Sequence, residues 1–382
     1  CIIEAMPTIG RKFLMAGKSG LNITTSKQNI SKQYGKSKEW IAPMVENFGP
    51  KNIIEFCQFL GQEIFVGSSG KAFPKTMKAS PLLRSWVTYL KKNRVEIYTS
   101  ARWKGFLKND DLISFNGKLS HLISYNHNDH LINSKATILA LGGASWSRLG
   151  SNGEWAKILC EYLPKNKTLL IPFGPANSGF RVSWSKHMMK FAGKPVKSVA
   201  ININGIRKKG EFVITRNGLE GGIIYHLSTF QQNKIKHIEL DLIPDLSVQR
   251  ICEKLAKRKA KSTFTSFLKT SLGLTGVKYG LLREFGYPYP VLIREFAKTL
   301  KNLKLNVEKK YPMDFSISTT GGIAREAVDF GLMLKEIPGV FCAGEMLDWT
   351  APTGGYLLTG CLSTGHHAGK SAADFLKLKP VN

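Results

Sequence analysis

The stretch FCAGEMLDWTAPTGGYLLTGCLSTG (341–365) decides the fold of this 382-residue chain. Its apolar start predicts the end of a buried strand, and that strand runs into Gly344 and Glu345, with Asp348 just beyond. A strand that ends in glycine and an acid is typical of a sheet edge that binds sugar-like hydroxyl groups. The two carboxylates therefore predict a site for the hydroxyls of a polyol chain.

The same stretch continues into a helix. Gly354 and Gly355 open a long run of small residues that predicts a helix to about Leu376. A helix N-terminus presents free N–H groups and a positive potential, which suits the negative edge of a ligand. The N1–C2 edge of a reduced flavin carries such a charge, so this helix start predicts a flavin site.

Two other strand ends, far away in the sequence, have the same character. Thr137–Leu141 is an apolar run that predicts a buried strand, and it ends in Gly142 and Gly143. Glycine there lets the chain pass close to a cofactor, although a simple tight turn has the same signature. Glu4 follows a short apolar run, and the acid that ends the second strand of a βαβ unit binds ribose hydroxyls. Together these strand ends predict a dinucleotide held largely by backbone.

The G-x-G-x-x-G fingerprint of a dinucleotide-binding unit does not occur after a strand in this sequence. It belongs one strand and one helix before Glu4. We therefore expect the parent protein to carry roughly 25–30 further N-terminal residues, because a βαβ unit runs to about 30 residues or more. No second fingerprint marks a nicotinamide domain, so we expect NAD(P)H to dock transiently or to be replaced by another donor.

Four long stretches, in order along the chain, resemble the BaiN/YhiN-like family of NAD(P)/FAD-dependent oxidoreductases. They are GRKFLMAGKSGLNITTS (10–26), GSSGKAFPKTMKASPLLRSW (67–86), GEFVITRNGLEGGIIYHLS (210–228) and the opening stretch, whose TAPTGGYLLTG form resembles one little-characterised subfamily. The resemblance covers nearly the whole chain. It implies an α/β fold: a glutathione-reductase-type FAD-binding domain, N-terminally truncated, with an inserted mixed β/α domain.

The resemblance also implies which residues would hold FAD. Glu4 would bind the adenosine ribose, and Arg11, Lys12 and Asn22 would lie along the cofactor. Gly142 and Gly143 would flank it, and Gly344, Glu345 and Asp348 would bind the ribityl chain. Gly354, Gly355 and Tyr356 would face the isoalloxazine ring.

The sequence assigns no catalytic residue. Tyr356 is a candidate proton donor to the substrate, but it would equally well only pack on the flavin ring. Trp349 has the same two interpretations. His366 and His367 fit residues that cap or solvate the last helix. Cys342 and Cys361 fit buried structural thiols.

The middle of the chain differs in character from its two ends. Val196–Ile203 and Glu211–Thr215 predict strands, while Ser247–Lys261 and Pro290–Leu300 predict amphipathic helices. We therefore expect three segments: the first part of the FAD-binding domain at 1–165, an inserted substrate or cap domain at 166–310, and the second part of the FAD-binding domain at 311–382.

The chain carries 55 Lys and Arg against 27 Asp and Glu, a net charge of +28. Residues 165–310 hold 28 basic and 9 acidic side chains, so +19 of the excess lies there. Such a field favours a polyanionic partner such as RNA or a small anionic substrate, although a solvated basic surface explains it equally well. The cluster that would contact phosphate is Lys254, Lys257, Arg258, Lys259 and Lys261.

Other classes of protein are disfavoured. No apolar run approaches the ~20 residues of a membrane helix, so we expect no membrane partner. Six scattered cysteines without a CxxC pair predict reduced thiols in a cytoplasmic protein, with neither metal site nor disulfide framework.

The family resemblance implies hydride transfer from reduced FAD to an activated C=C bond, in a conjugated enone or in the pyrimidine C5=C6 bond of RNA. Two alternatives stay open: an FAD-binding RNA-associated factor without turnover, and a non-functional truncated remnant.

Overall fold

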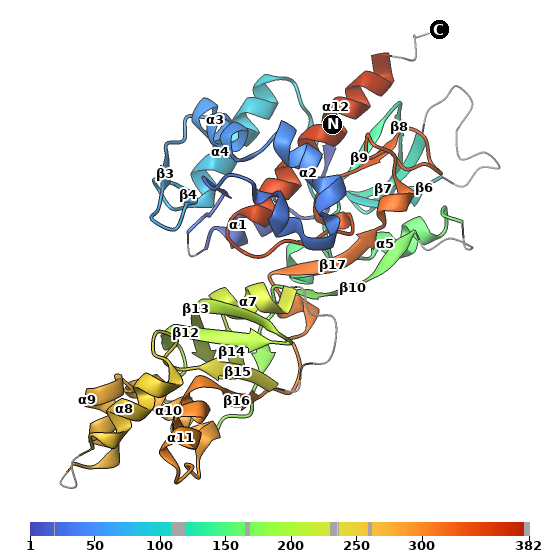
Figure 1. Cartoon of the computed structure of the whole chain (residues 1–382). Helices are drawn as coiled ribbons and strands as arrows, with labels where there is room; N and C mark the ends of the chain where they lie inside the picture. Colours follow the sequence, from blue (N-terminus) through green and yellow to red (C-terminus); the bar gives the residue numbers. More distant parts are fainter. Residues whose placement is uncertain are drawn as a thin grey trace. The chain divides into compact units, whose positions relative to one another are not determined.

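The computed structural model describes residues 1–18, 20–107, 119–164, 169–229, 235, 237–258 and 262–377. Contacts between Cα atoms divide the chain into two compact units (Figure 1). Unit 1 combines Cys1–Pro175 with Met313–Asn382, and unit 2 is Ala176–Pro312. Unit 2 is therefore inserted, in sequence, between the two parts of unit 1.

Unit 1 contains two pairs of parallel strands. Strand β1 (Ile2–Ile3) pairs with β5 (Ile97–Tyr98), and β9 (Thr137–Leu139) pairs with β18 (Val340–Cys342). In each pair the partners are far apart in sequence, because parallel strands need a long crossover connection. These pairs place two of the predicted strand ends, after β9 and after β18, side by side.

Antiparallel sheets and one further strand pair complete the strands of unit 1. One sheet contains β6, β7 and β8, another contains β2, β4 and β3, and β10 pairs with β17. Their bounds are β2 Thr24–Thr25, β3 Ile64–Val66, β4 Lys71–Pro74, β6 Arg102–Phe106, β7 Leu119–Tyr125, β8 Asn128–Ser134, β10 Leu170–Ala176 and β17 Ser318–Ile323. The strands of the β6-β7-β8 sheet run antiparallel to their neighbours, whereas β5 is parallel to its partner β1.

Helices α2 (Lys38–Asn47) and α3 (Pro50–Phe59) pack against α12, the long C-terminal helix Tyr356–Lys377 (Figure 1). Its buried face carries small residues, and a methyl group on Gly360 would come within 2.6 Å of the Trp349 ring. The other helices are α1 Arg11–Ala16, α4 Ala79–Lys92 and α5 Trp155–Cys160, with 3-10 turns η1 Ile30–Ser37, η2 Ser147–Leu149, η3 Met313–Phe315, η4 Arg325–Ala327 and η5 Gly344–Met346.

Unit 2 is built on a six-stranded antiparallel sheet in the order β11-β14-β13-β12-β15-β16. Helices pack on it around a hydrophobic core of its own. The strands are β11 Phe180–Arg181, β12 Pro195–Ile203, β13 Ile206–Thr215, β14 Gly218–Glu220, β15 His237–Asp241 and β16 Leu303–Asn306; the helices are α6 Lys186–Met189, α7 Gly222–Thr229, α8 Val248–Ala256, α9 Phe264–Leu272, α10 Gly276–Gly286 and α11 Ile293–Lys301. Both units mix helices and strands, so the predicted α/β class is confirmed.

Two helix predictions in unit 2 need shortening. The Ser247 hydroxyl accepts a hydrogen bond from the backbone N–H of Arg250, so α8 begins where the sequence predicted. It ends at Ala256, five residues before the predicted end at Lys261. Helix α11 begins at Ile293 and not at Pro290. A capping residue predicts where a helix begins, whereas an amphipathic pattern does not predict the residue at which the helix ends.

Candidate cofactor site

Three segments of unit 1 meet at the side chain of Lys12, in α1. Its ammonium group donates to the Glu345 carboxylate, with Nζ and Oε2 2.9 Å apart, and to the Ser145 hydroxyl at 3.2 Å. The two charged side chains are mostly buried, so their ion pair is shielded from solvent. The contact brings together the predicted residues Lys12 and Glu345, which lie 333 positions apart.

Gly143 passes very close to β17. A methyl group on it would lie 1.9 Å from Oγ1 of Thr319 and 3.1 Å from Cδ of Glu345. The Thr319 N–H in turn donates to Oε1 of Glu345 at 3.1 Å. The sequence explained this glycine by close approach to a cofactor, but its first constraint is the close approach of its own chain.

The strand end after β18 is fixed by several hydrogen bonds. Gly344 has φ +75°, a left-handed conformation that favours glycine, and its N–H donates to the Thr364 hydroxyl at 3.0 Å. Asp348 accepts a hydrogen bond from the Gly321 N–H at 3.0 Å. Burial raises the pKa of the Asp348 carboxyl. The two acids of the predicted polyol site are therefore both anchored to the backbone of β17.

The start of α12 lies against β2. Gly354 and Gly355 have φ values of +126° and +92°, and a methyl group on Gly355 would come within 2.5 Å of the Thr24 carbonyl oxygen. The carbonyl of Tyr356 accepts a hydrogen bond from the buried Tyr34 hydroxyl at 2.9 Å. Burial raises the pKa of Tyr356. The glycine pair therefore brings the first turn of α12 beside the segment that carries Asn22.

Two buried polar atoms in this neighbourhood have no partner among the described residues: Oδ1 of Asn22 and Oγ1 of Thr350. Buried polar groups are nearly always hydrogen-bonded, so such atoms point to a ligand. Arg11 likewise forms no hydrogen bond or ion pair within the described part of the chain. A dinucleotide cofactor offers hydroxyl and amide donors to Asn22 and anionic phosphates to Arg11. The residues present therefore fit FAD.

Glu4 lies at the end of β1, where its N–H donates to the Tyr98 carbonyl at 2.8 Å. Its Oε1 accepts the N–H of Met6 at 2.8 Å, and it lies near Gly150, since a methyl group there would be 3.9 Å from that oxygen. The adjacent Ser151 hydroxyl donates to the carbonyl of Gly143 at 2.6 Å. A chain of contacts thus links Glu4 to the glycine turn.

Gly142 completes that turn. It has φ +73°, and its carbonyl accepts the indole N–H of Trp155 at 2.8 Å. A methyl group on Gly142 would meet the Ser151 hydroxyl at 2.5 Å, so here the glycine is required by both backbone conformation and space. The turn is therefore fixed by packing from α5 on one side and from the segment after η2 on the other.

Ser145, Ser151 and Thr319 take part in this network, and sequence reasoning missed all three. Small hydroxyl residues are too common to stand out alone. The one available signal was position, since Ser145 follows the Gly142–Gly143 strand end directly.

His366 and His367 lie inside α12, so they cap neither of its ends, and both contact other segments of unit 1. His366 stacks on Phe48 with ring centroids 4.3 Å apart, and His367 bonds the Phe330 carbonyl at 2.7 Å. Burial raises the pKa of the Cys342 thiol, and it raises that of Cys361 to about 12. Both thiols are therefore protonated at neutral pH.

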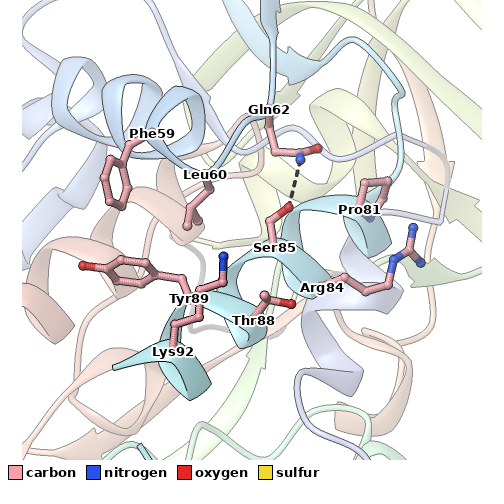
Figure 2. Close-up of a pocket in the computed structure, with 9 residues that line it drawn as sticks. All are labelled: Phe59, Leu60, Gln62, Pro81, Arg84, Ser85, Thr88, Tyr89 and Lys92. Atoms are coloured by element: carbon pink, nitrogen blue, oxygen red, sulfur yellow. Dashed lines mark hydrogen bonds between the residues drawn. The ribbon is translucent and has the colours of Figure 1, made fainter. Parts of the chain in front are cut away.

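A separate cavity of about 460 Å³ opens between α3 and α4 (Figure 2). In Figure 2 the side chains of α4 form its floor, and Gln62 bonds Ser85 across it at 3.2 Å. Its lining is Phe59, Leu60, Gln62, Pro81, Arg84, Ser85, Thr88, Tyr89 and Lys92. None of the predicted cofactor residues belongs to this lining. Within the described ranges no group of His, Cys, Asp and Glu is arranged to hold a metal ion, and no helix is long and apolar enough to cross a bilayer.

The fold and the converging strand ends define unit 1 as a Rossmann-type domain of the FAD-binding class. Residues 1–371 match the family described as "HI0933-like protein Rossmann domain", and the chain belongs to this family. The predicted family membership is confirmed, as is the predicted class of enzyme, a flavin-dependent oxidoreductase.

The chain is also similar to individual proteins. It is 22% identical, over 405 residues, to the 3-dehydro-bile acid delta(4,6)-reductase of Clostridium scindens, covering 98% of this chain and 92% of that one. It resembles the structure of 3-ketosteroid-delta4-(5alpha)-dehydrogenase from Rhodococcus jostii RHA1, with TM-score 0.44, 14% identity and coverage of 97% and 90%. It also resembles Mycobacterium smegmatis Sdh1, with TM-score 0.41 and 14% identity, and spans 62% of that chain with 100% of its own.

Proposed function

We propose that this protein reduces a C=C bond conjugated to a carbonyl group, in a small substrate that carries an anionic group, with reduced FAD as the hydride source. The observation that carries the proposal is the full-length match to a reductase, 98% of this chain against 92% of the relative. The name of that relative places its reaction at the delta(4,6) positions of a bile acid.

The residues of unit 1 would bind and orient the cofactor. The Lys12–Glu345 pair and Asp348 would meet its polyol chain, and Asn22 Oδ1 would accept a hydrogen bond from it. FAD supplies hydride transfer when bound. Tyr356, whose pKa is raised by burial, keeps its hydroxyl protonated at neutral pH and is our candidate to hold the proton that the second carbon of the bond needs.

The charge of the inserted region supports an anionic substrate. Residues 165–310 carry 28 basic and 9 acidic side chains, and a positive field of this kind raises the local concentration of anions. A carboxylic acid with an apolar carbon skeleton would carry both an enone and a negative charge. We propose NAD(P)H as the transient donor that reduces the flavin, since a flavin reductase cycle needs a two-electron source.

The same charge supports a second candidate, reduction of a pyrimidine C5=C6 bond in RNA. Of the basic cluster, Lys259 and Lys261 lie outside the described residues. Lys254 donates to the Ser271 carbonyl at 3.1 Å, and Arg258 donates to the Ser262 carbonyl at 3.1 Å. Both side chains therefore already donate hydrogen bonds to backbone carbonyls of unit 2. This weakens the case that the cluster binds phosphate groups, so RNA is the second choice.

An anaerobic assay tests the proposal. NADH or NADPH is added to the FAD-loaded protein with one acceptor at a time: a carboxylated enone, its uncharged ester, or a structured RNA. We expect oxidation of the nicotinamide only with an acceptor, and a product that has gained two hydrogen atoms. Photoreduced enzyme, mixed with each acceptor without nicotinamide, separates failure of the donor from failure of the acceptor. Flavin that stays reduced with every acceptor would contradict the proposal.

Binding measurements separate the RNA alternatives. If four phosphates are neutralised, the logarithm of RNA affinity should fall with the logarithm of salt concentration with a slope of about −3 to −4. Changing Lys254, Lys257 and Arg258 to Gln should then lower the affinity for many sequences alike, because phosphate contacts do not read sequence. Salt-dependent binding without any turnover would identify the RNA-associated factor instead.

A further inference from the structure

The segment that joins α10 to α11 carries an unusual set of exposed apolar side chains. Tyr287 is 72% exposed, Val291 97%, Leu292 69% and Ile293 43%. Single exposed apolar residues are ordinary, but three in succession, from the end of a loop into the first residue of a helix, are rare without a function. We call these four residues the apolar tip.

The tip stands on an aromatic base that holds the loop in place. Tyr289 packs against Phe264 and Phe296, with ring centroids 5.6 Å apart in both cases. Tyr287 meets Tyr289 edge-on at 5.6 Å. Phe296 belongs to the core of unit 2. Val291 and Leu292 follow Tyr289 but do not belong to these packed rings, and they are exposed.

Uncompensated cations border the tip. Arg283, in α10, and Arg294, next to Ile293 in α11, are both exposed and form no hydrogen bond or ion pair with any residue that the structure describes. Arg258 lies over the Phe264 ring of the base at 5.3 Å. The loop itself, residues 287–292, has no charged side chain. The apolar tip is thus flanked in sequence by two exposed arginines, Arg283 and Arg294, and a third, Arg258, lies at its aromatic base.

We propose that the apolar tip inserts into the surface of an anionic lipid bilayer. Aliphatic side chains enter the acyl boundary, tyrosines suit the interface, and arginines attract anionic headgroups. This attachment is peripheral, and it revises the expectation of no membrane partner, which rested on the absence of a spanning segment. It does not depend on the proposed reaction.

Two other occupants fit less well. A second copy of the chain would bring two basic surfaces together, and like charges oppose that contact. RNA binding uses aromatic stacking and arginines, but gains nothing from an apex of Val291 and Leu292. The charge and the aliphatic apex together favour lipid.

The test is co-sedimentation of the full chain with vesicles of phosphatidylcholine containing about 30% phosphatidylserine, and with pure phosphatidylcholine. Val291→Asp combined with Leu292→Asp should lower binding to the anionic vesicles at least tenfold. Arg283→Gln combined with Arg294→Gln should lower it by roughly 30-fold, because each of the two charges contributes about fivefold to the attraction. The matched control is Ile206→Asp, an exposed apolar position of β13 in the same unit, and it should change nothing.

Circular dichroism and thermal melting verify that each variant is folded, as expected for substitutions at exposed positions. Wild-type protein that does not sediment, or an aspartate pair that binds like wild type, would overturn the proposal. Gel filtration and RNA titration of the same variants are run in parallel. Loss of self-association or of RNA binding in the aspartate pair, without any vesicle binding, would overturn it in favour of that partner.

Discussion

Gly143 offers the sharpest test of the site geometry. Replacing it with alanine would place a methyl carbon 1.9 Å from Oγ1 of Thr319, where ordinary contacts need about 3.4 Å or more. Both residues are buried, and Thr319 is tied to Glu345 through its N–H. Neither the backbone at position 143 nor the Thr319 side chain can move away without a large cost in free energy. We expect Gly143→Ala to destabilise the protein by about 1–3 kcal/mol, the usual cost of overpacking, and toward the upper end of that range.

A double-mutant cycle on unfolding by urea isolates the clash. Thr319→Ala removes the oxygen at 1.9 Å and leaves Cβ at 3.2 Å, which is tight but tolerable. The pair Gly143→Ala with Thr319→Ala should therefore be at least about 1 kcal/mol more stable than the sum of the single effects predicts. Thr319→Val keeps an atom at the position of the oxygen and serves as the control.

Two results would contradict this prediction. A Gly143→Ala variant that unfolds no more easily than wild type would mean that the close approach does not exist. A Thr319→Val substitution that rescues as well as Thr319→Ala would mean that the loss comes from something other than contact with that atom.

Three further predictions follow from the same site and core. Glu345→Ala with Asp348→Ala should reduce FAD retention, because each carboxylate contributes charge-assisted hydrogen bonds worth about 1.5–3 kcal/mol; a purified variant as yellow as wild type contradicts this. Gly355→Val should lose both flavin and stability, and Gly193→Val, at similar φ but with nothing within 4 Å, should lose less. Burial lowers the pKa of His121 from 6.5 to about 4, so the folded protein disfavours protonation. Stability that is present above pH 6.5 should fall, by up to about 3 kcal/mol, as pH drops to 4, and the loss should be smaller in His121→Gln.

The sequence predicted the parts of the site that depend on local rules. Glu345 was identifiable because an acid after a strand and a glycine has a known role, and Gly355 because a glycine pair precedes a helix. Both positions needed only their neighbours in sequence. The structure places them in contact with β17 and β2, which gives each a packing reason as well.

The partners of those residues were not predictable in the same way. Thr319 lies in the run SISTTGG (316–322), which carries no mark of a site. Its role depends on how β17 lies against the turn at Gly143, a matter of tertiary register. Lys12 was named through the family resemblance, yet its contacts with Ser145 and Glu345 come from chain segments more than 130 positions away. Sequence patterns predict the character of residues within one helix or strand. They do not predict which residues come into contact where two elements pack.

Several acids of unit 2 form ion pairs with nearby lysine and arginine side chains. Asp241 bonds both Arg207, at 2.8 Å, and Lys301, at 2.7 Å, while Asp245 bonds Lys209 at 2.9 Å. Since nine acids face 28 bases between residues 165 and 310, most cations remain uncompensated whatever the pairing. The surplus therefore acts at long range, through the field around the unit.

Such a field speeds the encounter with an anion and leaves chemistry after binding unaffected. Raising the ionic strength from about 0.01 M to 0.15 M shortens the Debye length from about 30 Å to 8 Å. For a carboxylated enone we expect kcat/KM to fall several-fold over that range while kcat stays constant, because only association is screened. The uncharged ester should show neither change. If acid and ester respond alike, the basic surface does not guide the substrate, and the surplus belongs to a macromolecular or lipid partner.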